Sequence, residues 1–267
     1  MTARGGHLAS RAATVLKDRL IAVTRPREQA GSLVQGIEAL GGRVLLFPVL
    51  DIAPVWAPDR FDDVAARLGT FDLAFFVSPN AVRYGLDALL ARRDWPGSLA
   101  VATVGKGSER ALAERGFARV VAPASGFDSE AVLALPEFAA DAVRGRHVLV
   151  LRGDGGRDLL GETLRARGAT VEYLSCYCRS CPVIDPGILL QPAREGRLDA
   201  LVLTSSEGVR NLRALVGDEG IHLLAEVPVF ASHPRIAAQS RDGGFGHVVE
   251  TEAGDEGILR ALTRHFG

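Results

Sequence analysis

The chain has 267 residues, of which 47% are hydrophobic and 24% are charged, and its formal net charge is −1 at pH 7. No run approaches the roughly 20 consecutive apolar residues of a membrane-spanning helix, and the near-zero charge gives no general attraction to nucleic acid. We therefore expect one large or two ordinary globular domains, with neither a membrane nor a nucleic acid as partner.

Residues 1–19 are expected to form an N-terminal tail, because they lack the apolar stretch of a secretory signal. After them, apolar runs typical of β-strands alternate with segments of helical periodicity. In the first such segment Ala30, Leu33 and Ile37 share one face, and Gly41 follows as a stop. This alternation predicts an α/β fold with parallel sheets covered by helices. The expected strands are 20–24, 44–50, 73–77, 100–104, 147–151, 171–175, 200–203 and 228–231.

Three local patterns of the first half recur in the second half at a displacement of 127 residues. Because the same kinds of element recur in the same order, the chain is predicted to contain one folding unit twice. The recurrences pair 21–26 with 148–153, 72–83 with 199–210, and 103–105 with 230–232.

Two extended, proline-bounded stretches, 48–54 and 178–186, each follow the second strand of a repeat. Proline cannot donate to a sheet ladder, so both suit edge or linker strands where the chain crosses between domains. Tyr177 stands at the start of the second crossing, and strand alternation places it opposite to Cys176 and Cys178. Its phenol could donate a proton or a hydrogen bond into a cleft, or could simply be an amphipathic residue at a domain boundary.

Six predicted strands end in small or hydroxyl residues that open a helix, and together these ends could bind an anionic ligand. At the carboxyl edge of a parallel sheet, unpaired helix N–H groups and the helix dipole attract anions. Arg25, Arg27, Arg152 and Arg157 accompany two of the ends and could clamp a carboxylate. Each residue could instead be only a helix cap or part of an ion pair. The six ends are 24–26, 77–80, 105–108, 152–155, 204–206 and 232–234.

The three cysteines, Cys176, Cys178 and Cys181, lie within six residues, which is unlike the disulfide framework of a secreted protein and favours a reducing cytoplasm. Zinc or an iron–sulfur cluster would need a fourth ligand, and none stands nearby, so we expect no bound metal. The glycine-rich stretch 153–156 has neither the spacing of a dinucleotide motif nor the lysine of a phosphate-binding loop.

Taken in order, these segments resemble the uroporphyrinogen-III synthase family of tetrapyrrole biosynthesis. The resemblance covers about residues 20–260 and depends on the ordered set, since no single motif is diagnostic. The matching segments are Val23-Thr-Arg-Pro26 with Gln29-Ala30, residues 40–54, Phe76-Val-Ser-Pro-Asn-Ala-Val82, Val104-Gly105 with Ser108 and Ala111-Leu112, Leu151-Arg-Gly153 with Arg157, residues 164–169, residues 171–177, and Thr204-Ser205.

The resemblance implies two flavodoxin-like α/β domains joined by a two-stranded linker. Residues 20–52 and 183–267 would form domain 1, and residues 53–182 would form domain 2. The first unit of each repeat would then pair with the later units of the other copy.

The implied reaction is the cyclisation of hydroxymethylbilane to uroporphyrinogen III, with loss of water and inversion of ring D through a spiro intermediate, and it needs no cofactor. Tyr177 matches the family's candidate proton donor. The chain departs from the family at Lys106 and at 232–235, where His233 or Arg235 could contact a propionate instead. The expected substrate-binding residues are Arg25, Ser78, Asn80, Gly105, Lys106, Ser108, Arg152, Gly153, Arg157, Thr204, Ser205, Ser232, His233 and Arg235.

A non-catalytic small-molecule binding or sensor module of two domains is the alternative function, because fold does not determine function. If the chain is the enzyme, we expect a cytoplasmic monomer whose partner is the small-molecule substrate. A transient contact with the preceding enzyme of the pathway is left open.

Overall fold

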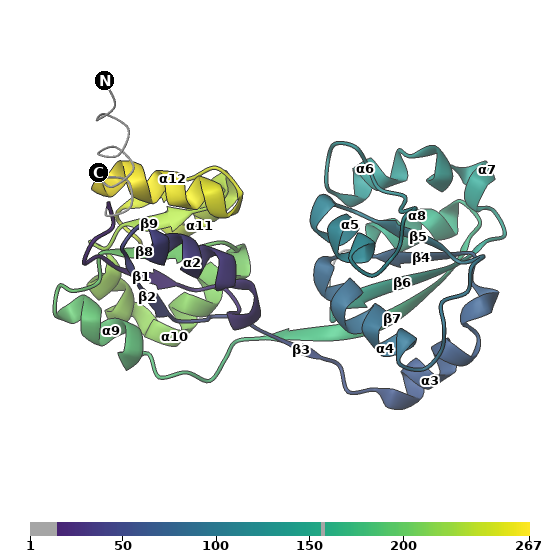
Figure 1. Ribbon diagram of the computed structural model, residues 1–267, viewed down its shortest axis with the longest axis horizontal. Coiled ribbons are helices and arrows are strands. Elements are labelled where there is room, and N and C mark those ends of the chain that lie inside the picture. The colour runs from purple at the N-terminus through teal and green to yellow at the C-terminus, as the bar shows by residue number, and fades with distance from the viewer. Residues whose placement is uncertain (1–14, 156–157) are drawn as a thin grey trace, which may run out of the picture. The chain divides into compact units, whose positions relative to one another are not determined.

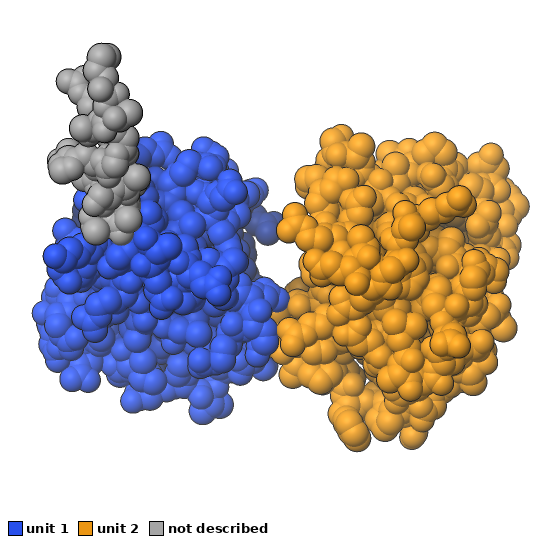
Figure 2. Space-filling model, in the orientation of Figure 1, with its two compact units in different colours: residues 1–51, 180–267 blue, residues 52–179 orange. Residues whose placement is uncertain are grey.

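The computed structural model describes residues 15–155 and 158–267, which form two compact units (Figure 2). Unit 1 contains the chain up to Asp51 together with Ser180–Gly267, and unit 2 contains Ile52–Arg179. The chain therefore leaves unit 1 once and returns to it. None of the helices in the described part of the chain has the length and hydrophobicity needed to span a membrane.

Unit 1 is a five-stranded sheet with helices on both faces (Figure 1). The strand order is β10-β9-β8-β1-β2, and each neighbouring pair is parallel. Helices α2 and α12 pack on one face, and α9, α10 and α11 pack on the other. The bounds are β1 Leu20–Val23, η1 Arg27–Gln29, α2 Gly31–Ala39, β2 Arg43–Leu46, α9 Gly187–Arg194, β8 Ala200–Leu203, α10 Ser206–Leu224, β9 Val229–Ala231, α11 Pro234–Asp242, β10 Val248–Glu250 and α12 Gly254–Phe266.

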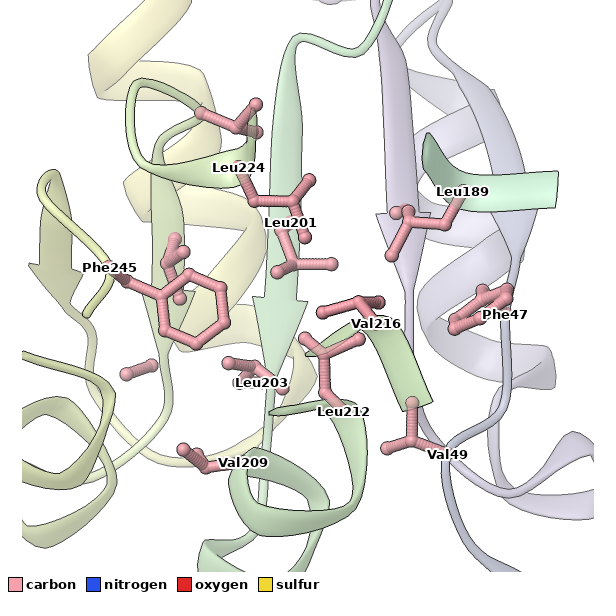
Figure 3. Close-up of a cluster of buried hydrophobic side chains, with 14 of the residues drawn as sticks. Phe47, Val49, Leu189, Leu201, Leu203, Val209, Leu212, Val216, Leu224 and Phe245 are labelled. Carbon is pink, nitrogen blue, oxygen red and sulfur yellow. The ribbon is translucent and has the colours of Figure 1, made fainter. Parts of the chain in front are cut away.

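Burial on both faces of this sheet explains the composition of its central strands. Every residue of β1 and β8 is apolar and buried, as is typical of parallel strands covered on both sides. On one face, Leu189 of α9 and Leu212 of α10 pack with Leu203 of the sheet (Figure 3). On the other face, Leu33 of α2 packs with Leu262 of α12. Each such leucine contributes roughly 1.5–3 kcal/mol by leaving water.

Unit 2 is also a five-stranded sheet with helices on both faces, with the strand order β3-β7-β6-β4-β5 and β3 at the edge beside β7. Helices α3, α4, α5 and the π-helix η3 pack on one face, and α6, α7 and α8 pack on the other. The bounds are β3 Asp51–Pro54, α3 Pro58–Ala66, η2 Leu68–Thr70, β4 Leu73–Phe76, η3 Ala81–Leu86, α4 Asp87–Leu90, β5 Ala100–Thr103, α5 Lys106–Ala113, α6 Ser129–Leu133, η4 Pro136–Phe138, α7 Ala140–Val143, β6 His147–Gly153, α8 Leu159–Ala166 and β7 Thr170–Ser180.

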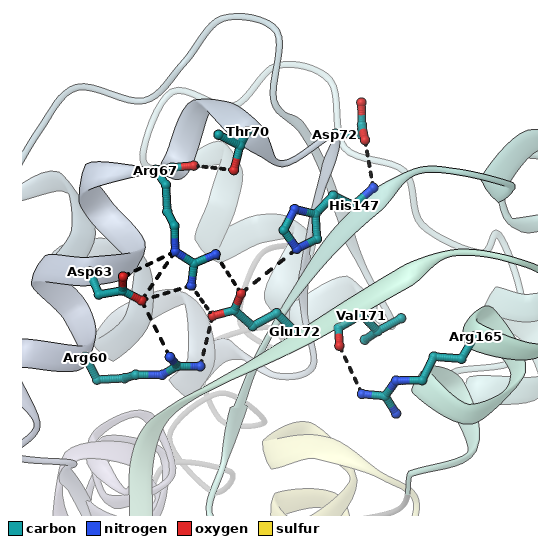
Figure 4. A network of polar contacts seen from close by, with 9 residues as sticks. All are labelled: Arg60, Asp63, Arg67, Thr70, Asp72, His147, Arg165, Val171 and Glu172. Atoms are coloured by element: carbon teal, nitrogen blue, oxygen red, sulfur yellow. Dashed lines mark hydrogen bonds and ion pairs between the residues drawn. The ribbon is translucent and has the colours of Figure 1, made fainter.

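A network of charged side chains joins α3 to β7 in unit 2 (Figure 4). The Glu172 carboxylate accepts hydrogen bonds from Arg67 at 2.7 and 2.8 Å and from Arg60 at 2.9 Å. Asp63 accepts a further hydrogen bond from Arg67 at 2.9 Å. The Arg67 guanidinium holds the pKa of Glu172 below its usual value, because it stabilises the ionised carboxylate.

The two sequence repeats are interleaved between the units. Strand β1 of the first repeat pairs with β8 of the second, and β6 of the second pairs with β4 of the first. The same polar contact begins both pairings: Asp199 accepts from the Leu20 N–H at 2.8 Å, and Asp72 accepts from the His147 N–H at 2.7 Å. Equivalent strands of the repeats therefore take equivalent places in different units.

The first expected helix and its stop are confirmed. Helix α2 ends before Gly41, which has a φ of +85°, and α8 ends before Gly168, with a φ of +91°. Glycine adopts this left-handed conformation without steric cost, so it ends both helices in the same way.

Several elements differ from the expectation. The second strand ends at Leu46, although Phe47 still donates its N–H to the Val23 carbonyl at 2.9 Å and Val49 donates to the Thr24 carbonyl at 3.1 Å. Strand β10 was not expected, because a segment of three residues carries little periodic signal. Residues 15–19 are not part of a loose tail, since Leu16 is fully buried in the core of unit 1 and donates its N–H to the Leu40 carbonyl at 2.9 Å.

Candidate active site

A break in strand pairing sets the position of Tyr177. Strands β6 and β7 pair in regular register as far as Arg152 and Ser175, and then Gly153 pairs with Tyr177, so that Cys176 has no opposite residue. The expectation that Tyr177 faces away from Cys176 is wrong, because this bulge interrupts the alternation of the strand. Both side chains are only 1% exposed, and both pack into the same apolar cluster.

The ring of Tyr177 lies directly on Gly153. A Cβ atom at Gly153 would stand 2.7 Å from Cε2 and 2.8 Å from Cζ of that ring, well inside van der Waals contact. Glycine at this strand end therefore makes room for the tyrosine. The neighbouring ring of Tyr84 lies 6.2 Å away, between centroids.

The Tyr177 hydroxyl is held by two side chains. It forms a hydrogen bond of 2.9 Å with Ser78 Oγ and accepts one of 3.3 Å from Arg179 Nη2. Ser78 Oγ also accepts the N–H of Ala81 at 3.1 Å, at the start of η3. Arginine can only donate, so the phenol proton of Tyr177 is free to point toward Ser78 Oγ.

Arg179 and Asp154 complete the arrangement, and neither was expected as a site residue. The Asp154 N–H donates to the Tyr177 carbonyl at 2.9 Å, and its carboxylate accepts the Arg179 N–H at 3.1 Å. The Arg179 guanidinium also lies over the Tyr177 ring, 5.5 Å from its centroid. The spacing of two residues along a strand puts positions 177 and 179 on one face, which is the signal that could have identified Arg179.

These groups line a cavity of about 270 Å³ within unit 2, at the carboxyl ends of β4 and β6. Apolar walls come from strands and from α8, whereas Arg152, Asp154, Tyr177 and Arg179 supply polar groups. Phe127, which is 60% exposed, also lines it. A cavity that combines apolar walls with convergent polar groups can bind a small molecule.

Comparison with known proteins identifies the family. The family model described as "Uroporphyrinogen-III synthase HemD" matches residues 31–260. The uroporphyrinogen-III synthase of Escherichia coli (strain K12) is 31% identical over 245 residues, which are 91% of this chain and 99% of that protein. The chain belongs to the uroporphyrinogen-III synthase family. It is therefore an enzyme, and the alternative of a non-catalytic binding module is not favoured.

Solved structures support the fold of this uroporphyrinogen-III synthase family member. A mutant uroporphyrinogen III synthase from the extreme thermophile Thermus thermophilus aligns with a TM-score of 0.61 at 21% identity, covering 92% of this chain and 98% of that one. The uroporphyrinogen-III synthetase of Helicobacter pylori 26695 aligns with a TM-score of 0.57 at 13% identity, covering 92% and 99%. At these identities the likeness is one of fold, a two-domain α/β architecture.

The residues expected to bind substrate are divided between the units. The cavity of unit 2 brings Arg152 and Gly153 next to Tyr177, and Ser78 contacts the Tyr177 hydroxyl. Unit 2 also contains Asn80, Gly105, Lys106 and Ser108, whereas unit 1 contains Arg25, Thr204, Ser205, Ser232, His233 and Arg235. Arg157 lies outside the described residues.

Three cationic members of this set have acidic partners inside their own units. Arg25 pairs with Asp255, Arg152 with Asp158 at 2.6 Å, and Lys106 with Glu109 at 2.8 Å. Such pairs orient the cations, and a carboxylate ligand would have to compete with or join the existing partner.

Several hydroxyl and imidazole groups act as helix caps. Ser205 Oγ accepts the Gly208 N–H of α10 at 2.9 Å, and His233 Nδ1 accepts the Arg235 N–H of α11 at 3.1 Å. Ser108 is 2% exposed, and its N–H donates to the Gly105 carbonyl at 3.1 Å. The capping interpretation thus accounts for the contacts of Ser205 and His233.

The three cysteines are free thiols in different surroundings. Cys176 donates to the Leu174 carbonyl at 3.2 Å, and burial raises the pKa of its thiol to about 12. Cys178 contacts the Ala53 carbonyl at 3.6 Å, whereas Cys181 is exposed. In the described part of the chain, no group of three His, Cys, Asp or Glu side chains is placed to hold a metal ion.

Proposed function

We propose that this chain closes hydroxymethylbilane to uroporphyrinogen III, with loss of water and inversion of ring D, and that Tyr177 donates the first proton. The observation that carries the proposal is the hydrogen-bonded Tyr177 hydroxyl on the wall of the unit 2 cavity. A phenol in this position can serve as a general acid without any metal or cofactor. Membership of the uroporphyrinogen-III synthase family supports uroporphyrinogen III as the product.

The first step would be transfer of the Tyr177 proton to the terminal hydroxyl of the bilane, which leaves as water. The azafulvenium cation that results is attacked by the substituted carbon of ring D, giving a spiro intermediate. This intermediate fragments and recloses as the type III isomer. Since the bilane also cyclises unaided to the type I isomer, the main contribution of the enzyme would be to hold the reacting carbons in the right geometry.

The eight carboxylates of the substrate would be met by helix N-termini and cations. We keep all fourteen expected binding residues as proposed contacts, with Arg152 and Gly153 at the cavity as the best supported.

We further propose that the units are flavodoxin-like domains, 20–52 with 183–267 and 53–182, joined by a two-stranded linker. Renumbered within unit 1, its strand order β2-β1-β8-β9-β10 becomes 2-1-3-4-5, which is the flavodoxin-like order. Three free cysteines favour a reducing cytoplasm. A monomer, with a transient contact to the preceding pathway enzyme, is the assembly to be tested.

The deciding experiment supplies hydroxymethylbilane, oxidises the products and separates the porphyrin isomers. We expect predominantly type III product, formed faster than the spontaneous reaction. Type I product alone, at the spontaneous rate, would refute the proposal.

Tyr177→Phe tests the proton donor. We expect kcat to fall about 10- to 100-fold without being abolished, because general acids contribute roughly 10²–10⁴ and the leaving group retains spontaneous reactivity. Tyr84→Phe is the matched control, since that hydroxyl contacts the Ile52 carbonyl at 3.2 Å and does not line the cavity. A Tyr177→Phe enzyme with the kcat of the wild type would exclude Tyr177 as the donor.

A further inference from the structure

We infer that Arg179 is a positioning residue for Tyr177, which it orients and whose oxygen it stabilises as the proton leaves. The inference rests on the proposed function of Tyr177 as proton donor. It assigns a role in the reaction to a residue that the sequence motifs did not point to.

Two hydrogen bonds of Asp154 fix the backbone around Arg179, so the point from which its side chain extends is fixed as well. Asp154 holds both ends of the segment: its N–H donates to the Tyr177 carbonyl at 2.9 Å, and its carboxylate accepts the Arg179 N–H at 3.1 Å. From this anchor the guanidinium lies over the Tyr177 ring and reaches the hydroxyl with Nη2 at 3.3 Å.

The donors and acceptors around the hydroxyl give its proton a direction. Arg179 has no acceptor, so it must donate to the phenol oxygen. Ser78 Oγ already accepts the Ala81 N–H, and it can accept the phenol proton as well or donate its own. With Arg179 occupying one lone pair of the oxygen, the O–H bond of Tyr177 is restricted to the remaining directions, toward Ser78 or the cavity.

The positive charge of Arg179 acts on the Tyr177 oxygen while the proton is transferred to the substrate. When the Tyr177 O–H bond breaks, the proton goes to the leaving hydroxyl of the bilane, which departs as water, and the electron pair stays on the phenol oxygen. A guanidinium hydrogen-bonded to that oxygen stabilises the negative charge more strongly than a neutral donor would. The proton that ring closure later releases from the substrate restores the phenol, so the overall reaction consumes no proton.

A double-mutant cycle tests the inference, with kcat and KM for hydroxymethylbilane measured for the wild type, Tyr177→Phe, Arg179→Ala and the double variant. We expect Arg179→Ala to lower kcat about 10-fold while KM changes less than about 2-fold, in line with loss of a transition-state interaction. In the Tyr177→Phe background, Arg179→Ala should have no further effect, because the atom on which it acts is absent.

Two further variants separate this role from a structural one. Arg92→Ala is the matched control, since the Arg92 guanidinium lies over the Phe61 ring at the same 5.5 Å and does not line the cavity. Arg179→Lys keeps the charge and should have a kcat between those of Arg179→Ala and the wild type. If Arg179→Ala does not fold, Arg179→Lys replaces it in the double-mutant cycle. The lysine variant should then lower kcat by a smaller factor, and only when Tyr177 is present.

The outcomes distinguish the inference from the function on which it rests. Wild-type kcat in Tyr177→Phe would overturn both. A slow Tyr177→Phe enzyme together with an unaffected Arg179→Ala enzyme would overturn the inference alone. The same would follow if Arg179→Ala lowered kcat equally in both backgrounds, because Arg179 would then act independently of the hydroxyl.

Discussion

Gly153→Ala should disturb both the stability of unit 2 and the proposed proton donor. Carbon atoms in contact normally stand about 3.5–4.0 Å apart. The new Cβ would stand 2.7 Å from the Tyr177 ring, so the ring would have to recede by about 1 Å. The Ser78 hydrogen bond, now 2.9 Å, would then lengthen by up to about 1 Å, which at the full shift is beyond hydrogen-bonding range.

The expected cost combines two effects. Overpacking in a close-packed core costs about 1–3 kcal/mol, and the lost hydrogen bond adds about 1 kcal/mol. We therefore expect the free energy of unfolding to fall by about 2–4 kcal/mol. The kcat should fall to near that of Tyr177→Phe, because the hydroxyl is displaced from Ser78 and Arg179.

Urea denaturation followed by tryptophan fluorescence measures this loss in the relevant unit. Both tryptophans, Trp56 and Trp95, belong to unit 2. Gly69→Ala is the control, since nothing lies within 4 Å of its added Cβ, and its change should stay within about 0.5 kcal/mol. The reasoning is refuted if Gly153→Ala changes neither the unfolding free energy by more than the control nor kcat.

Two further predictions follow from pKa directions. Arg67 lowers the pKa of Glu172 in the folded state, so the ion pair stabilises the fold. This stabilisation is fully present above the unfolded-state pKa of Glu172, about 4.5, and is lost as the pH falls through the lower pKa of the folded state. The difference in urea midpoint between the wild type and Glu172→Gln should therefore be constant from pH 7 to about 5.5 and shrink toward pH 3; a constant difference down to pH 3 would contradict this. At pH 8, iodoacetamide should modify exposed Cys181 in the native enzyme but Cys176 only after denaturation, as read by mass spectrometry, because burial raises the pKa of Cys176 to about 12. Modification of native Cys176 at the rate of Cys181 would show that the thiol is accessible.

Only part of the candidate site could be predicted from the sequence. Tyr177 and Gly153 stood at recognisable strand ends, and the resemblance to a family pointed to both. The roles of Arg179 and Asp154 were not predicted, because these roles depend on contacts between residues at the ends of two different strands. The bulge at Cys176 was missed too, since it depends on how two strands pair and a single strand carries no sign of it.

The kind and order of the elements follow from the sequence alone. Apolar runs predicted the strands, helical periodicity predicted the helices, and the displacement of 127 residues revealed the repeat. These are local properties, because burial on both faces of a parallel sheet dictates apolar strands wherever they occur. The register of β6 on β7 and the contact of Ser78 with Tyr177, which lie 99 residues apart, are set by the folded chain as a whole. Such pairings depend on which distant surfaces fit together, so they exist only once the chain has folded.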